Sequence, residues 1–400
     1  MHIQSSQGIQ LKDVGIIGAE SGVRLLDSTV NMERCSIASS GTLLLVENSN
    51  SKLVDCRMCD SRSGDGLVAT GKFSYVAAKG CQFLDNFGCC VYMFDGAGGA
   101  FEGCTFKGAK EYVGMALKDV GTRVSAVDCE FSDNGRNGMA VGGGACASLD
   151  QCTLQNTRKF HGLAISDPGS KVMASDCKFH DNEQCGVFVA NQASVTLERC
   201  FSKRARQFSG VAIKDKWSTL LATGCEFAEN QHSGVAAGAG SSVTLNSCVL
   251  KGAKDFYGLG VTGDGTEVVS RDCQFLDNRR CGVYVYSGGK ASLEKCISKG
   301  ATEFDGLAVF GKGSVSNTSS ELVAEGCLFV DNKRNGVTVG GGASVKLIEC
   351  ISRRSDTVST NSGRGLSVIG KKSRVTIHRC NFGDTMNEKQ KFYRVLGCFS

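Results

Sequence analysis

Cysteines recur along this chain at spacings that alternate without a break between 25 and 23 residues. The cysteines of this series are Cys56, Cys81, Cys104, Cys129, Cys152, Cys177, Cys200, Cys225, Cys248, Cys273 and Cys296. A second series lies on a 24-residue grid, with Cys90 at its one non-glycine position, and comprises Gly66, Gly114, Gly138, Gly162, Gly186, Gly210, Gly234, Gly258, Gly282 and Gly306. A fixed period of this length indicates a repeat protein, so it overrides the two or three domains that 400 residues would otherwise suggest.

Apolar residues alternate with polar or small ones around each of these repeat glycines. The residues one and three places after the glycine are apolar, as in Val187/Val189, and a second such pair precedes each cysteine, as in Val195/Leu197. A period of two over so few residues predicts short strands with one buried face. A 24-residue unit of this kind cannot bury its own apolar side and must stack on its neighbours. We therefore expect an all-β fold, a right-handed parallel β-helix of about 14 turns with 24 residues per turn. The handedness follows the general rule for parallel crossovers.

Stacking places equivalent side chains in columns. The cysteine column is predicted to consist of buried, unpaired thiols, because parallel Cβ vectors disfavour disulfide geometry. Two aromatic rows are predicted to lie in the core, although a ligand-stacking row remains an alternative. The rows are Phe83, Phe131, Phe179, Phe227 and Phe275, and Tyr112, Phe160, Phe208, Phe256 and Phe304.

Asp-Asn pairs such as Asp133-Asn134 recur on alternate turns, and basic residues such as Lys107 and Lys299 take nearly the same place on the turns between. We interpret them as a charge-alternating surface column, with a row of catalytic carboxylates as the alternative. The asparagines are predicted to support left-handed turn geometry.

Three outward positions hold aromatic residues where most turns have alanine: Tyr92, Phe188 and Tyr284. Exposed rings on a flat face are candidate anchors for a protein partner. Isolated exposed aromatics are also ordinary in soluble proteins, so this alternative stays open.

Acidic residues gather where strands pass into the next turn, at Asp95, Asp119, Asp167 and Asp215, and Lys214 lies beside the last of them. Carboxylates on neighbouring turns beside a cation are candidates for an acid-base or calcium-binding group. Aspartate in a glycine-rich turn is equally explained by turn geometry.

Several functions lack a sequence signal. The formal charge of +5 is too small to indicate nucleic-acid binding, and no apolar stretch is long enough to span a membrane. Cys56-Arg57-Met58-Cys59 has no second ligand pair, so no metal site is predicted, and no cofactor or catalytic triad is either. The opening residues lack the apolar core of a signal peptide and the chain holds 22 cysteines, which predicts reduced thiols and a cytoplasmic location, with secretion only if the N-terminus is incomplete. No N-terminal cap is visible, so either the first turns are irregular or the chain belongs to something longer.

Two polar insertions, Gly313–Glu321 and Ser355–Gly363, interrupt the period near its end. Beyond Cys380, a capping-box pattern at Thr385 and Glu388 and a stop at Gly397 predict a short helix over roughly 386–396. We therefore expect a β-helix over residues 1–380 and a C-terminal cap over 381–400.

The repeated pattern C-x-F-x-D-N-x-x-x-G-V-x-V, seen at Cys177–Val189 and with variations at Cys225–Ala237, resembles the parallel β-helix repeats of the pectin-lyase-like superfamily. That resemblance implies the fold over about residues 10–380 but no particular activity, since the superfamily includes polysaccharide lyases, hydrolases and epimerases and also non-catalytic protein-binding β-helices. No counterpart of the enzymes' catalytic motifs can be placed in this chain. The leading hypothesis is a non-catalytic scaffold that binds a protein partner. The alternative is a carbohydrate-active or glycan-binding β-helix that uses Asp95 and Asp119 or Asp167 and Asp215.

Overall fold

The computed structural model describes residues 1–311, 319–353, 364–383 and 396–398. This described part contains β-strands joined by turns and loops, and no α-helix. The predicted right-handed parallel β-helix of about 14 turns with 24 residues per turn is confirmed. The chain divides into two compact units, Met1–Thr196 and Leu197–Ser400, which are described one at a time.

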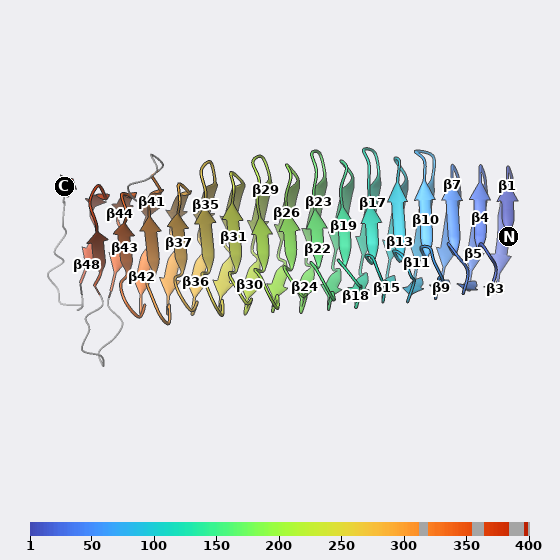
Figure 1. Cartoon of the computed structure of the whole chain (residues 1–400), viewed down its shortest axis with the longest axis horizontal. Helices are drawn as coiled ribbons and strands as arrows, with labels where there is room; N and C mark the ends of the chain where they lie inside the picture. Colours follow the sequence, from blue (N-terminus) through green and yellow to red (C-terminus); the bar gives the residue numbers. More distant parts are fainter. Residues whose placement is uncertain (312–318, 354–363, 384–395, 399–400) are drawn as a thin grey trace. The chain divides into compact units, whose positions relative to one another are not determined.

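In the first unit, each circuit of the chain contributes one strand to each of three parallel sheets, A, B and C (Figure 1). Sheet A contains β1 (His2–Gln4), β4 (Val23–Leu26), β7 (Leu44–Glu47), β10 (Leu67–Thr70), β13 (Val91–Phe94), β16 (Met115–Leu117), β19 (Met139–Val141), β22 (Leu163–Ile165) and β25 (Val187–Val189). Sheet B contains β2 (Ile9–Lys12), β5 (Thr29–Glu33), β8 (Asn50–Val54), β11 (Tyr75–Lys79), β14 (Gly98–Glu102), β17 (Arg123–Val127), β20 (Cys146–Asp150) and β23 (Lys171–Ser175), and β26 (Ser194–Glu198) straddles the division between the units. Sheet C contains β3 (Gly15–Ile17), β6 (Ser36–Ala38), β9 (Arg57–Cys59), β12 (Gln82–Leu84), β15 (Thr105–Lys107), β18 (Glu130–Ser132), β21 (Thr153–Gln155) and β24 (Lys178–His180).

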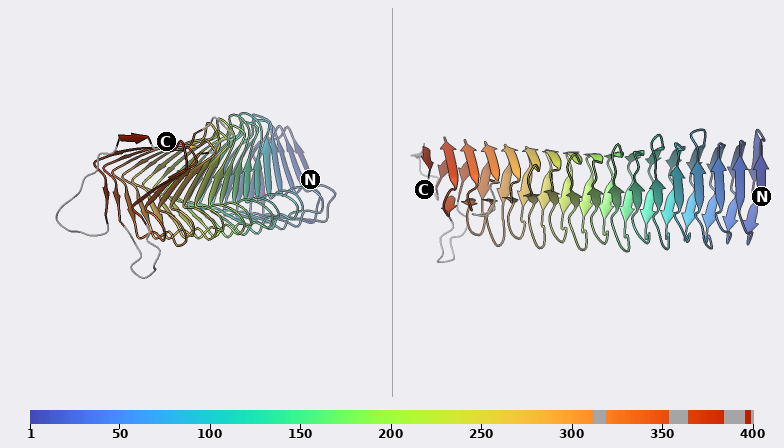
Figure 2. Two further views of the ribbon diagram at one scale, coloured as in Figure 1. Left: turned by 60° about the vertical axis from the view of Figure 1, so that its left-hand side comes forward. Right: turned by 45° about the horizontal axis from the view of Figure 1, so that its top comes forward.

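The second unit repeats this arrangement, and the views of Figure 2 show its strands side by side from two further directions. Sheet A contains β28 (Val211–Ile213), β31 (Val235–Gly238), β34 (Leu259–Thr262), β37 (Val283–Tyr286), β40 (Leu307–Phe310), β43 (Val337–Gly340) and β46 (Leu366–Ile369). Sheet B contains β29 (Thr219–Thr223), β32 (Ser242–Asn246), β35 (Glu267–Arg271), β38 (Lys290–Glu294), β41 (Glu321–Glu325), β44 (Ser344–Ile348), β47 (Arg374–His378) and β49 (Leu396–Cys398). Sheet C contains β27 (Phe201–Lys203), β30 (Glu226–Ala228), β33 (Val249–Lys251), β36 (Gln274–Leu276), β39 (Ile297–Lys299), β42 (Leu328–Val330), β45 (Ile351–Ser352) and β48 (Asn381–Phe382).

The repeat glycines stack as the period predicts, and close approach explains why they are glycines. A Cβ on Gly114 would lie 2.6 Å from the carbonyl oxygen of Gly138, and a Cβ on Gly138 would lie 2.6 Å from that of Gly162. At these two positions a larger residue would require the adjacent circuit to shift, although the coil accommodates Cys90 at the equivalent position of one circuit. The strands that follow are therefore held in register, and their apolar pairs lie over one another in the interior.

The cysteines of the series form a column of buried thiols without disulfides, as predicted. Each thiol of this column donates to a carbonyl oxygen, as Cys225 Sγ does to Thr223 at 3.4 Å. The first aromatic row is also in the core: Phe83, Phe131, Phe179 and Phe227 are fully buried, and Phe275 is 1% exposed.

The core prediction for the second aromatic row is wrong. Tyr112, Phe160 and Phe208 are 47%, 38% and 42% exposed. The loop from sheet C to sheet A is one residue longer on these circuits, and its rings lie outside, where a cation such as Arg136 packs over the Tyr112 ring at 5.1 Å.

The buried asparagines differ from their prediction as well. In the Asp133-Asn134 pair, the aspartate has the left-handed conformation, with φ of 56°. The Asn134 side chain is buried and bridges to the preceding circuit: its Oδ1 accepts from the Ala109 N–H at 3.0 Å and its Nδ2 donates to the Phe106 carbonyl at 3.1 Å. Ion pairs Lys107–Asp133 at 3.4 Å and Lys299–Asp331 at 3.7 Å confirm the alternating charges at these two places.

The C-terminal prediction falls largely outside the described residues. The helix expected over 386–396 and its capping residues Thr385 and Glu388 belong to 384–395, except for Leu396 at its end. Residues Leu396–Cys398, including Gly397, form β49, which pairs antiparallel with β47. Most of the two insertions, residues 312–318 and 354–363, is likewise outside the described part.

Candidate functional site

A pocket of about 310 Å³ opens on the outer face of sheet A in the second unit. Strands β37, β40 and β43 supply its base through Tyr284, Ala308 and Thr338. The loops that lead into these strands and into β34 supply most of the walls, and Phe310 of β40 and Ile369 of β46 complete them. The pocket therefore spans five consecutive circuits of the coil.

Stacked tyrosines form one wall of this pocket. The rings of Tyr257 and Tyr284 lie 4.4 Å apart and are parallel to within 9°, and Phe310 lies 6.0 Å from Tyr284. Position 260 holds glycine, and a Cβ there would approach the Tyr257 ring to 3.3 Å. Burial raises the pKa of Tyr257 to about 12 and also raises that of Tyr284, so both phenols stay neutral hydrogen-bonding groups.

Two arginines stand at the rim, each held against an aromatic ring. The guanidinium of Arg280 lies 4.5 Å from the ring centre of Phe256, and that of Arg334 lies 4.2 Å from that of Phe304. A guanidinium fixed over a ring keeps its N–H donors at the edge of the plane, where they can bind a carboxylate or sulfate in two-point fashion. The aromatic row that was expected in the core thus orients cations at the pocket.

Asp305 is the acidic residue of the pocket lining and is only 5% exposed. Its Oδ1 accepts a hydrogen bond of 2.9 Å from the backbone N–H of Asn335, the equivalent residue of the next circuit. Burial is the main cause that raises the pKa of Asp305. Asn335 continues the series, because its Oδ1 accepts from the Arg364 N–H at 3.0 Å and its Nδ2 donates to Thr338 Oγ1 at 2.9 Å.

The same role recurs at the residue before other repeat glycines. Asn137 Oδ1 accepts from the His161 N–H at 2.9 Å, and Ser233 Oγ accepts from the Tyr257 N–H at 3.4 Å. The first role of Asp305 is therefore to accept a hydrogen bond from the backbone of the next circuit. Its second role is to place a negative charge between the two arginines.

The aromatic residues predicted as anchors lie in different places. Tyr284 belongs to the pocket, whereas Tyr92 and Phe188 are in the first unit. Tyr92 stacks on Phe94 at 4.8 Å and Phe188 stacks on His161 at 4.5 Å. All three rings are half-buried against neighbouring rings.

The predicted acidic residues lie in the turns from sheet A to sheet B. Asp95, Asp119, Asp167 and Asp215 all have positive φ, between 56° and 77°, which is the turn geometry that was the alternative explanation. The side chain of Asp167 accepts from the Gly143 N–H at 3.0 Å, and the Asp215 carbonyl accepts from the Ser218 N–H at 3.1 Å. Lys214, the residue before Asp215, is exposed. None of these five residues lines the pocket.

Sequence reasoning missed Tyr257, Arg280, Asp305 and Arg334. The sequence does contain a signal for them. The residue directly before a repeat glycine is often Asp, Asn, Ser or His, and the residue two places before it alternates between aromatic and basic from Phe256 to Arg334. If the residues at each of these two positions are stacked circuit on circuit, the four residues are predicted to lie close together.

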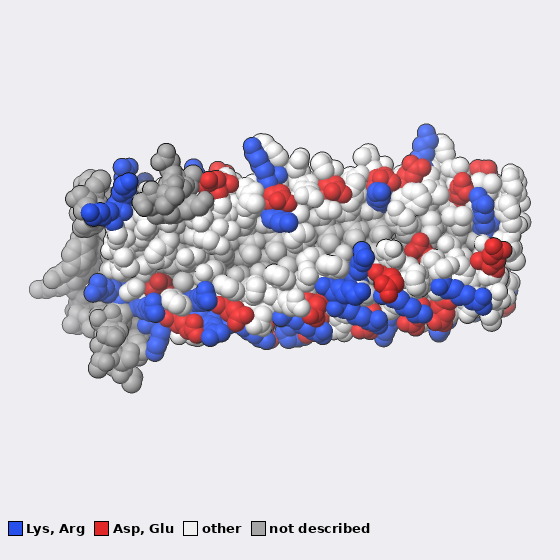
Figure 3. Space-filling view, in the orientation of Figure 1, with Lys and Arg blue, Asp and Glu red and all other residues white. Residues whose placement is uncertain are grey.

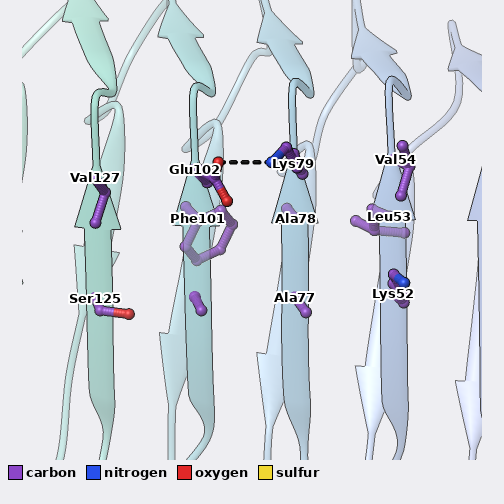
Figure 4. A pocket seen from close by; sticks show the side chains of 11 residues that line it. Lys52, Leu53, Val54, Ala77, Ala78, Lys79, Phe101, Glu102, Ser125 and Val127 are labelled. Carbon is purple, nitrogen blue, oxygen red and sulfur yellow. Dashed lines mark hydrogen bonds and ion pairs between the residues drawn. The ribbon is translucent and has the colours of Figure 1, made fainter.

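A second hollow, of about 500 Å³, lies on the outer face of sheet B in the first unit. Figure 4 shows residues of β8, β11, β14 and β17 around it, with Lys52, Ala77 and Ser125 in the lowest row of the drawn side chains. Lys79 and Glu102 pair with each other across its edge at 2.7 Å. Small side chains and an internally satisfied ion pair offer little for specific recognition, so the pocket of the second unit is the stronger candidate.

Charges elsewhere on the surface are mixed. Figure 3 shows lysine and arginine interspersed with aspartate and glutamate along the lower edge of the visible face. Pairs such as Arg279–Glu303, at 2.8 Å, neutralise one another. Within the described residues there is no group of three or more His, Cys, Asp or Glu arranged to hold a metal ion. No helix in the described part of the chain is long and apolar enough to cross a membrane.

Comparison with known proteins identifies one family. The profile described as "Right handed beta helix region" matches residues 1–154, 113–272, 161–318 and 209–382. No curated protein sequence matches significantly.

Solved structures share the fold at low identity. The periplasmic alginate epimerase AlgG is 12% identical, with a TM-score of 0.45 over 91% of this chain and 78% of its own. The A-module of the mannuronan C-5 epimerase AlgE4 of Azotobacter vinelandii is 12% identical, with a TM-score of 0.43 over 87% of this chain and 91% of its own. The structure of the Vag8–C1 inhibitor complex contains a chain that is 12% identical, with a TM-score of 0.46 over 95% of this chain and 97% of that one.

These neighbours include a periplasmic protein and contradict the predicted cytoplasmic location. The prediction rested on the large number of cysteines and on the lack of a signal-peptide pattern. The geometry of the stacked column disfavours disulfides in any compartment, so the reduced thiols carry no information about location.

Proposed function

Since the chain belongs to the family of right-handed β-helix proteins, we propose that it binds a saccharide bearing carboxylate or sulfate groups in the pocket of the second unit. The observation that carries the proposal is the pair of guanidinium groups, Arg280 and Arg334, each fixed on an aromatic ring beside the Tyr257–Tyr284 stack. Aromatic faces bind the apolar faces of sugar rings, and fixed guanidinium groups bind their acidic substituents.

The charge of the pocket favours an anion. Two arginines face one aspartate, and burial raises the pKa of that aspartate, so the lining has a positive balance. Arg280 and Arg334 precede strands that are two circuits apart, which corresponds to about 10 Å along the coil. They therefore suit different acidic groups of one oligosaccharide.

We propose binding rather than turnover. Hydrolysis of glycosidic bonds ordinarily uses two carboxyl groups facing the scissile bond. Among the described residues that line the pocket, Asp305 is the one carboxyl, and its Oδ1 is engaged by the Asn335 N–H.

A protein-binding scaffold receives less support from the geometry. An anchor residue inserts a projecting ring into a partner's pocket. Tyr92, Phe188 and Tyr284 are instead half-buried and stacked on their neighbours.

Titration calorimetry with polygalacturonate, alginate and neutral dextran tests the proposal. We expect binding of the two acidic polymers, weakening as salt is added, and none of dextran. The double variant Arg280→Gln/Arg334→Gln should lose at least tenfold in affinity, or about 1.4 kcal/mol. Arg271→Gln is the matched control, because Arg271 is an exposed arginine of the same unit that pairs with Glu294 on sheet B. Equal binding by the double variant and the wild type would overturn the proposal.

A further inference from the structure

The single tryptophan of the chain occupies a turn position, two residues before a sheet B strand, that glycine holds on several other circuits. The turn from sheet A to sheet B requires a left-handed residue, and the equivalent residues of the two following circuits are Gly240 and Gly265, with φ of 84° and 74°. Trp217 adopts this conformation with φ of 72°, as the unbranched residues Gln192 and Lys372 do at the equivalent position of other circuits, with φ of 67° and 68°. A bulky residue in this region is disfavoured, because its Cβ crowds the following backbone.

Burial of the Trp217 side chain does not offset the cost of this backbone conformation. The Trp217 side chain is 65% exposed, and Lys216 Nζ lies over its ring at 4.7 Å. A strained and exposed residue of this size points to a function, because neither the turn nor the core needs it.

We propose that Trp217, with Lys214 and Lys216, is a second contact for the acidic saccharide bound in the pocket. This inference rests on the proposed function. An indole face stacks on a sugar ring, and the two lysines of the same turn match its acidic groups. Both sites border sheet A of the second unit, since Trp217 follows β28 and Tyr284 lies in β37.

The chemistry of the neighbouring turns favours a polymer over a membrane surface. Membrane-surface proteins insert a set of apolar side chains together. The next two turns of this edge present Ala239-Gly240 and Asp264-Gly265, which add no large apolar group and include an acid.

The separation of the two contacts sets the ligand's length. Strands β28 and β37 are three circuits apart, or about 14 Å along the coil. A saccharide long enough to reach from the pocket to Trp217 gains affinity from the second contact, because that contact forms at high effective concentration. A short one gains nothing.

Trp217 is the only tryptophan, so its fluorescence reports on this contact alone. We would titrate the full chain with a trimer and an octamer of galacturonate and follow both calorimetry and tryptophan emission. The octamer should bind at least tenfold more tightly than the trimer and shift the emission, while the trimer should bind without a shift. Trp217→Gly should reduce the octamer's affinity to that of the trimer, and Trp217→Phe should restore most of it.

Three results would overturn the inference. If Trp217→Gly leaves the octamer's affinity unchanged and emission never shifts, Trp217 is no contact, yet trimer binding that depends on Arg280 and Arg334 still supports the proposed function. If neither oligomer binds, both proposals fail. If emission shifts with phosphatidylserine-containing vesicles and not with the octamer, the surface is a membrane contact.

Discussion

The backbone N–H of Cys185 donates a hydrogen bond of 3.2 Å to Nδ1 of His161, the equivalent residue of the preceding circuit. The proton of the neutral imidazole therefore lies on Nε2. One circuit earlier Asn137 Oδ1 accepts the His161 N–H in the same way. A histidine thus serves as a half-buried acceptor in a column otherwise built from Asn, Ser and Asp.

Replacing His161 by asparagine should remove an acid sensitivity from the first unit. Burial lowers the pKa of His161 to about 4 from its usual 6.5. Between these values the unfolded imidazole takes up a proton that the folded one excludes, so the free energy of unfolding falls as the pH falls, by about 3 kcal/mol in total. His161→Asn keeps the acceptor and has no such proton. Urea unfolding of both proteins at pH 7 and pH 4.5 measures the difference, and an identical pH dependence would show that His161 already titrates normally when folded.

Asp305 gives a test of the same column inside the pocket. Asp305→Ala leaves the Asn335 N–H without its acceptor and should lower the free energy of unfolding by about 1–3 kcal/mol. Asp305→Asn keeps an oxygen there and should be at least as stable as the wild type at pH 7, because burial disfavours the charged carboxyl. As the pH falls through the raised pKa of Asp305, the carboxyl becomes neutral, and the free energy of unfolding of the wild type should approach that of Asp305→Asn. Thermal unfolding of the three proteins decides it, and equal losses in the two variants would refute the acceptor role.

The thiol column predicts a slow and selective reaction with thiol reagents. Every thiol of the series is at most 2% exposed, so a reagent cannot reach it in the folded protein. The buried cysteines should therefore stay unmodified in native protein, while Cys146, which is partly exposed, should react. Denatured protein should yield all 22 thiols. Mass spectrometry after brief alkylation locates the modified residues, and rapid labelling of Cys225 would contradict the packing described.

Trp217→Gly should not destabilise the fold. The substitution relieves a left-handed conformation that costs a non-glycine residue about 1–2 kcal/mol, although glycine gains freedom in the unfolded chain, so the net change should lie between zero and about 1 kcal/mol of stabilisation. A buried ring behaves oppositely: Phe227→Ala should cost about 3–5 kcal/mol. Melting temperatures measure both variants. A large loss on removing the tryptophan would mean that it packs in the native state.

Most of the fold could be predicted because the same sequence pattern occurs in many successive repeats, and each occurrence supports the same structure. The spacing of Gly114, Gly138 and Gly162 sets the length of a circuit, and the alternation at Val187 and Val189 sets which side faces inward. The row of Tyr112 failed because hydrophobicity alone does not tell a core ring from one that binds a cation outside. The neighbour that decides the matter, Arg136 at 5.1 Å from the Tyr112 ring centre, is 24 residues away in sequence.

The candidate site was harder to predict, since its residues differ in type at equivalent positions. Tyr284 was identified because an aromatic ring interrupts a row of alanines. Asp305 was missed because its position holds Asp, Asn, Ser or His on different circuits, so no single residue type recurs there, and its burial depends on the loops of two adjacent circuits. Asp95, Asp119, Asp167 and Asp215 drew attention because they are regular, and the left-handed turns in which they lie account for that regularity.

A crystal structure of the protein with a galacturonate oligomer would test the central claim, that the pocket of the second unit binds an acidic saccharide. We predict a sugar ring beside Tyr257 and Tyr284 and carboxylates within hydrogen-bonding distance of Arg280 and Arg334. Well-ordered sugar bound elsewhere on the coil, with this pocket holding only water, would contradict the claim.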